Sequence, residues 1–259
     1  MARAIWKGNL QLGKHELAVK LYSAIEDRTV RFHLLHAKDR APVEQHIVRK
    51  DTGNDVGKTD MRKAFALDRS TAVILEPEDL EKLVPPESRA IEISRFIAPS
   101  ALGDQWYDRP YFLGPDADDS DYFALAEALH KKNVVGIARW VMRKKRYVGA
   151  LTSTNGYLML STLRRADQVL SFSGIEPGKV NSPAASELKL AQQLVTSIET
   201  DFDPSVWQNE YRERLHKLID AKARGEKLEP VRPRKKAASA SLAESLRASI
   251  AAVKEKKVA

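Results

Sequence analysis

The sequence predicts an α+β fold that is mainly β, with a body of barrel or sandwich type followed by helices and a basic tail. Short β-type segments recur at close spacing as far as residue 163, which is typical of these architectures. After Val180 the apolar residues change to helical spacing. From residue 226 onward, prolines and a run of basic residues indicate an extended linker.

The body is expected to alternate strands with a few inserted helices. In chain order, strands are expected over residues 4–12, 17–24, 29–36 and 71–75, a helix over 77–83, strands over 90–97 and 109–113, and a helix over 121–132. The first three strands are separated by Gly13-Lys14 and Glu26-Asp27, which are turn signals. A hydrophobic content of 43% is enough for a real core.

A basic β-hairpin is the feature of this body that most directly indicates a ligand. Residues 137–143 alternate, so that one face can pack while Arg139 and Arg143 lie on the other. Residues 146–151 can return beside them, and a strand over 157–163 follows the turn at 153–156. The stretch 131–147 has no acidic residue and seven basic ones: Lys131, Lys132, Arg139, Arg143, Lys144, Lys145 and Arg146. This patch favours a phosphate ligand, and the alternative is a solvated basic turn.

Two helices are predicted after the body. Residues 186–199 have apolar residues at helical spacing, and Asp203-Pro204 is a suitable N-cap and first-turn pair for a second helix that Gly225 would end. Four side chains would form one stripe on this second helix: Trp207, Tyr211, Leu215 and Leu218. Such a stripe is either part of an intrachain core or a surface that packs on a partner subunit.

The tail, residues 226–259, carries much of the positive charge. It holds nine Lys or Arg and four Glu, which is +5 of the total of +8. A basic tail and one concentrated patch predict a polyanion that is contacted at chosen places. The linker cluster consists of Arg232, Arg234, Lys235 and Lys236. Beyond it, Leu242, Leu246 and Ile250 lie on one face of a short predicted helix, which we expect to fold on a partner because it is marginal alone.

No catalytic or metal site is indicated, and we expect no cofactor. The chain has no cysteine, which removes disulfides, thiolate zinc sites and cysteine nucleophiles. Asp51-Thr52-Gly53 resembles an aspartic-protease turn but has no second copy to pair with. His33 and His36 would point to opposite faces of a strand, and the acidic run at 116–121 lacks the glycine of a calcium loop. Without an apolar run for a signal or a membrane span, a cytoplasmic protein is expected.

A set of short blocks carries a resemblance to a known family. The blocks are Arg3–Gly8, Val19–Ala24, Arg31–Asp39, Thr71–Leu75, Ile91–Ile93, Tyr111–Pro115, Val141–Arg143, Thr162–Arg164, Phe202–Pro204 and Tyr211-Arg212. Together they resemble the bacterial Ku family of DNA-end-binding proteins. Some members carry two cysteines after the block that ends at Asp39, and this chain has none, so no zinc site is carried over.

The resemblance implies a homodimer, or a mixed dimer with a paralogue, whose β-barrels and bridging hairpins close a ring around double-stranded DNA at its ends. The basic hairpin would belong to this bridge. Its seven basic residues and the linker cluster would bind phosphates without reading sequence. The stripe from Trp207 to Leu218 would pack between subunits. The tail residues Leu242, Leu246, Arg247 and Ile250 would bind the ATP-dependent DNA ligase of non-homologous end joining.

The implied domains are a barrel core with its bridge over residues 1–185, a helical arm over 186–225, and the linker with the ligase-binding helix over 226–259. On this interpretation the chain is a scaffold and not an enzyme. The alternative is a non-specific architectural protein that coats DNA without preference for ends.

Overall fold

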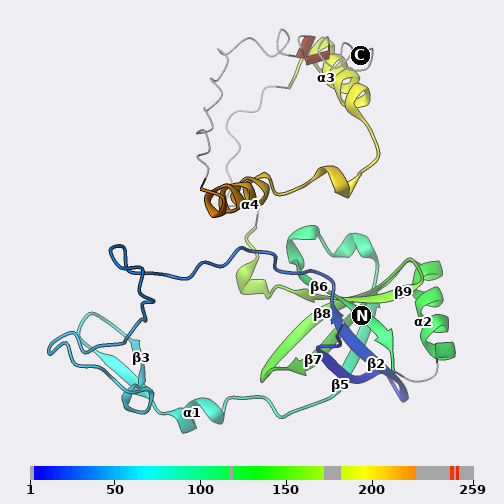
Figure 1. Cartoon of the computed structure of the whole chain (residues 1–259). Helices are drawn as coiled ribbons and strands as arrows, with labels where there is room; N and C mark the ends of the chain where they lie inside the picture. The colour runs from blue at the N-terminus through cyan, green and yellow to red at the C-terminus, as the bar shows by residue number, and fades with distance from the viewer. Residues whose placement is uncertain (1–2, 117–118, 172–181, 226–245, 248, 251–259) are drawn as a thin grey trace. The chain divides into compact units, whose positions relative to one another are not determined.

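The computed structural model describes residues 3–116, 119–171, 182–225, 246–247 and 249–250 (Figure 1). The chain divides into two compact units, Met1–Gly174 and Ile175–Ala259. The first unit contains a closed barrel, so the prediction of a mainly β fold is confirmed, and the body is a barrel and not a sandwich.

Seven strands form the barrel in the order β1-β2-β6-β9-β8-β7-β5. Their bounds are β1 Trp6–Leu12, β2 His15–Ser23, β5 Ala90–Ile97, β6 Tyr107–Pro115, β7 Val135–Met142, β8 Lys145–Thr154 and β9 Tyr157–Leu163. All neighbouring pairs are antiparallel except β1 and β5, which pair in parallel and close the barrel. Closure leaves none of these strands with a free edge.

The barrel and helix α2 (Asp119–Lys132) share one apolar core. Alternate residues of the strands are buried, as Leu17, Val19 and Leu21 of β2 illustrate. On α2, Tyr122 and Ala126 belong to the same cluster. The Tyr122 hydroxyl donates to the Leu113 carbonyl at 2.6 Å and accepts from the Leu158 N–H at 2.8 Å. One buried side chain therefore joins α2 to both β6 and β9.

Residues 24–89 connect β2 to β5 and contain no buried residue. Their elements are the 3-10 helix η1 (Lys58–Asp60), β3 (Lys63–Ala66), β4 (Ala72–Leu75) and α1 (Pro77–Glu81). Strand β4 confirms one prediction, and its partner β3 was not predicted. The strand expected over 29–36 was wrong, because β2 already pairs with β1 and β6 and offers this alternating segment no edge. Only an isolated bridge, Leu35 to Pro42, forms there.

The second unit contains α3 (Ala185–Ile198), the 3-10 helix η6 (Pro204–Val206) and α4 (Glu210–Ala223). Gly225 follows α4 with φ of 78°, as expected of a residue that ends a helix. The predicted start of this helix at Asp203-Pro204 was wrong. The Asp203 carboxylate accepts from the Ser205 N–H at 2.9 Å and caps only η6, whereas the Asn209 side chain caps α4.

The predicted stripe is therefore shorter than expected. Trp207 precedes α4 and does not share its helical face with Tyr211, Leu215 and Leu218. Trp207 and Tyr211 are 74% and 69% exposed, Leu218 is exposed and Leu215 is half-buried. The stripe is thus not part of a buried core within the described residues.

Candidate nucleic-acid interface

The basic hairpin, which was expected to belong to the bridge, is part of the barrel wall. Strands β7 and β8 pair from Gly136 opposite Leu151 to Met142 opposite Lys145 (Figure 1). The predicted inward face of β7 is confirmed, because Ala138, Trp140 and Met142 are all buried.

Trp140 fixes the hairpin from inside. Its ring stacks on Tyr147 with centroids 5.4 Å apart. It also occupies the space beside Gly149, where an added Cβ would lie 2.6 Å from Trp140 Cζ3. The basic side chains are therefore mounted on a well-packed wall, which suits a precisely held binding surface.

The tip of this hairpin has an unusual composition for its geometry. Arg143 and Lys144 form a two-residue turn with φ of 50° and 62°, both in the left-handed region. Such turns strongly favour Asn-Gly, and the next hairpin uses that pair, Asn155 and Gly156. Each non-glycine residue in this region costs about 1 kcal/mol. Two long cations thus occupy positions where the backbone favours other residues, which makes them candidates for a role in binding.

Strand alternation places the remaining cations of the hairpin on two faces. Arg146 lies opposite Val141, so it shares the outer face of the wall with Arg139. Lys145 lies opposite the buried Met142, at the rim of the barrel.

Some predicted phosphate ligands have acidic neighbours. Lys131 Nζ lies 3.1 Å from Glu127 Oε1 on α2. Arg139 lies opposite Glu92 in the β5–β7 register, so the two project from the same face. Lys132 ends α2, where a cation complements the helix dipole.

In contrast, four basic residues of the hairpin have neither an ion pair nor an acid opposite them in the described part of the chain: Arg143, Lys144, Lys145 and Arg146. The tertiary structure therefore concentrates the candidate interface at the hairpin tip. The common property of these four residues is a positive charge that no acid among the described residues neutralises.

The tail residues predicted to bind DNA or ligase are only partly described. Leu246, Arg247 and Ile250 are helical, with Arg247 exposed and the two apolar residues half-buried. Leu242 and the linker cluster of Arg232, Arg234, Lys235 and Lys236 lie outside the described residues.

Comparison with known proteins places this barrel in a family. The family model described as "Ku70/Ku80 beta-barrel domain" matches residues 11–190, which includes every barrel strand after β1. The chain belongs to the Ku family. The resemblance carried by the short sequence blocks is thereby confirmed.

Curated Ku proteins match nearly the whole chain. It is 35% identical to non-homologous end joining protein Ku 2 of Geotalea uraniireducens (strain Rf4), over 95% of this chain and 96% of the relative. It is 33% identical to the Ku protein of Anaeromyxobacter sp. (strain K), over 99% and 88% of the two chains. The Ku protein of Archaeoglobus fulgidus is 32% identical over 97% of this chain and all of its own.

Neither a metal cluster nor a membrane-spanning helix is found where the chain is described. No group of three or more His, Cys, Asp or Glu residues there is arranged to hold a metal ion. None of the helices described combines the length and the apolar character needed to cross a bilayer.

Proposed function

We propose that this Ku-family protein binds the ends of double-stranded DNA without reading sequence and acts in non-homologous end joining. The observation that carries the proposal is the hairpin tip, where Arg143 and Lys144 have unfavourable φ angles and their side chains have no partner among the described residues. Relatives that span almost the whole chain are named as end-joining proteins, which supports the same conclusion.

The tip would contact the phosphate backbone and not the bases. Guanidinium and ammonium groups on a turn can follow phosphates, and phosphate contacts carry no direct sequence information. Each phosphate neutralised adds about −0.9 to the slope of log affinity against log salt. The barrel contributes rigidity, and the protein works by binding and not by catalysis.

A ring-shaped homodimer requires a surface that joins two copies. Residues 24–89 offer such a surface, because their apolar side chains are exposed. They bury no side chain, and many of their large apolar residues are exposed: Ile25, Phe32, Leu34, Leu35, Val43, Ile47, Val48, Phe65, Leu67, Val73, Ile74 and Leu83. Exposed apolar surface of this extent marks an interaction site. We propose that this segment forms the bridge of the ring, and that Trp207, Tyr211, Leu215 and Leu218 pack on a partner separately.

Two substitutions test these surfaces independently. Phe65→Glu, at a side chain that is 64% exposed on β3, should convert the dimer to monomers, because the charge cannot be buried against a second copy. Tyr211→Glu should do the same if α4 packs between subunits. Light scattering on the purified variants measures the mass. Ala64→Glu, at the neighbouring residue on the opposite face of β3, is the matched control and should stay dimeric. A dimer that survives Phe65→Glu would remove the segment from the interface.

The tail would recruit the ATP-dependent ligase of the pathway through its short helix, with Leu242, Leu246, Arg247 and Ile250 as contacts. Apolar residues at helical spacing on a segment too short to be stable alone support this proposal. The linker cluster would add phosphate contacts near the loaded end.

The test of end binding compares one plasmid in linear and covalently closed form by gel shift. A threaded ring should bind only the linear form, and longer linear DNA should give additional bands as more rings load. Equal binding to both forms would favour the architectural DNA-coating alternative. A chain that ends at Gly225 serves as the control, because a tail-driven coating protein would lose nearly all binding, whereas a ring would keep its preference for ends.

A further inference from the structure

A basic groove lies beside the hairpin, between the start of β8 and the end of β9. Its volume is about 720 Å³, and its wall includes Lys145 and Arg146 on one side and Arg164 and Arg165 on the other. Arg164 and Arg165 lie outside the basic hairpin and the linker cluster. Trp106 and Tyr147 also line the groove and give it partly apolar walls.

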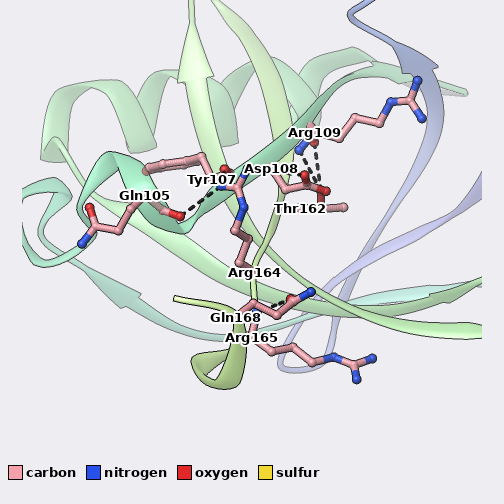
Figure 2. Close-up of polar contacts among 8 residues, drawn as sticks. All are labelled: Gln105, Tyr107, Asp108, Arg109, Thr162, Arg164, Arg165 and Gln168. Carbon is pink, nitrogen blue, oxygen red and sulfur yellow. Dashed lines mark hydrogen bonds and ion pairs between the residues drawn. The ribbon is translucent and has the colours of Figure 1, made fainter. Parts of the chain in front are cut away.

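The Arg164 side chain is bound by other groups of the same chain. Its guanidinium donates to the backbone carbonyls of Gln105, at 3.0 Å, and Tyr107, and it lies 3.7 Å from the Asp108 carboxylate (Figure 2). Its backbone N–H donates to the Trp106 carbonyl at 2.8 Å. Arg164 therefore holds the end of β9 to the start of β6, and its charge is compensated.

Arg165 has the opposite arrangement. Its backbone is fixed, because its N–H donates to Gln168 Oε1 at 2.9 Å and its carbonyl accepts from the Gln168 N–H at 3.0 Å. Its guanidinium has no partner among the residues that the structure describes, and it extends away from the Arg164 network (Figure 2). A fixed backbone that carries an unpaired guanidinium is suited to bind an external anion.

The charges of the groove do not cancel. Asp108 is the acid among the lining residues, and Arg164 and the Thr162 hydroxyl, which donates to it at 3.2 Å, already engage it. Lys145, Arg146 and Arg165 remain without an acidic partner among the described residues. Two of these side chains adjoin the hairpin tip, so the groove continues the candidate interface along the wall.

We propose that this groove binds internal phosphodiester groups of the DNA backbone, with Arg165 as a ligand and Arg164 as its structural support. The proposal rests on the proposed function and deepens it. It assigns a phosphate contact on β9, outside the basic hairpin. DNA lying across the tip of β7–β8 would continue over the groove, so that Arg146 and Arg165 bind phosphates from opposite sides.

Arg165→Ala tests the proposal against a matched charge deletion, Arg109→Ala. Arg109 belongs to the same region, but its side chain points to the other side of the network and does not line the groove (Figure 2). For a linear duplex, Arg165→Ala should weaken binding about tenfold, as expected for one charge-assisted hydrogen bond. It should also make the salt slope shallower by about 0.9, and Arg165→Lys should restore part of the affinity. Arg109→Ala should change neither quantity.

Equal losses in the two alanine variants would mean that net charge alone matters and would overturn the proposal. Duplexes with 5′-phosphate and 5′-hydroxyl ends separate two sources of phosphate. The Arg165→Ala loss should be the same on both, and a loss confined to the phosphorylated end would contradict internal contacts. If wild type fails to prefer linear plasmid while Arg165→Ala still weakens binding, the proposed function fails and the groove stands. If wild type prefers linear plasmid and Arg165→Ala binds as tightly as wild type, the proposal for the groove is rejected and the proposed function stands.

Discussion

Replacing Arg143 by Asn and Lys144 by Gly is expected to make the protein more stable and its DNA binding much weaker. Both positions have positive φ, which Asn and Gly adopt more readily than Arg and Lys. The free energy of unfolding should rise by about 1–3 kcal/mol. Affinity for linear DNA should fall about a hundredfold, because two phosphate contacts are lost, and the salt slope should lessen by about 1.8.

The next hairpin provides the control. Asn155→Arg with Gly156→Lys places the same two cations in a turn of the same kind, with φ of 52° and 79° in the present sequence. This variant should lose stability without gaining the affinity that the first variant lost. Denaturant unfolding and salt-dependent gel shifts measure both quantities. Unchanged DNA affinity in the Arg143/Lys144 variant would remove the tip from the interface.

Tyr122→Phe is expected to lower the free energy of unfolding by about 2–4 kcal/mol. The buried hydroxyl donates to the Leu113 carbonyl and accepts from the Leu158 N–H, so its removal leaves two backbone groups without a partner away from water. Tyr157→Phe is the matched control, because the Tyr157 side chain is exposed, and it should be close to neutral. Denaturant unfolding compares the two variants.

The same hydroxyl gives this prediction a pH dependence. Burial raises the pKa of Tyr122 above its ordinary value of 10.0. The stabilisation is therefore fully present below that value and is lost as the pH rises through the folded-state pKa, because only the unfolded chain ionises readily. The difference in the free energy of unfolding between wild type and Tyr122→Phe should therefore become smaller in alkaline solution. A difference in the free energy of unfolding that stays constant with pH would contradict the role assigned to the hydroxyl. So would a loss of stability in Tyr157→Phe as large as that in Tyr122→Phe.

Much of the barrel could be predicted because strand alternation is a local signal. The bounds of β5 and β9 match the expected residues 90–97 and 157–163, and the buried face of β7 was assigned correctly. The wrong predictions occur where a segment has the local pattern of an element but lacks the neighbouring strand or the further helical turns that would complete it. Residues 29–36 alternate like a strand but find no edge, and Asp203 caps a single turn before Asn209 begins the longer helix.

The candidate site was predictable in composition but not in arrangement. The sequence shows seven basic residues over 131–147 without an acid between them. It does not show that Glu127 pairs with Lys131, or that Glu92 faces Arg139 across two strands. The sequence signal for Arg165 is its position in a basic pair after a strand. This does not reveal that the Arg164 guanidinium is engaged, whereas the Arg165 guanidinium has no partner among the described residues.

The sequence by itself determined the mainly β character, the basic hairpin and the membership of the Ku family, because these depend on local periodicity and on residue identity at fixed spacing. Only the tertiary structure decided that the hairpin is a wall of a closed barrel and which of the basic residues have an acidic neighbour among the described residues. Charge compensation depends on side chains brought together from distant segments. Asp108 and Arg164 are an example, because the pairing of β6 with β9 brings them within 3.7 Å.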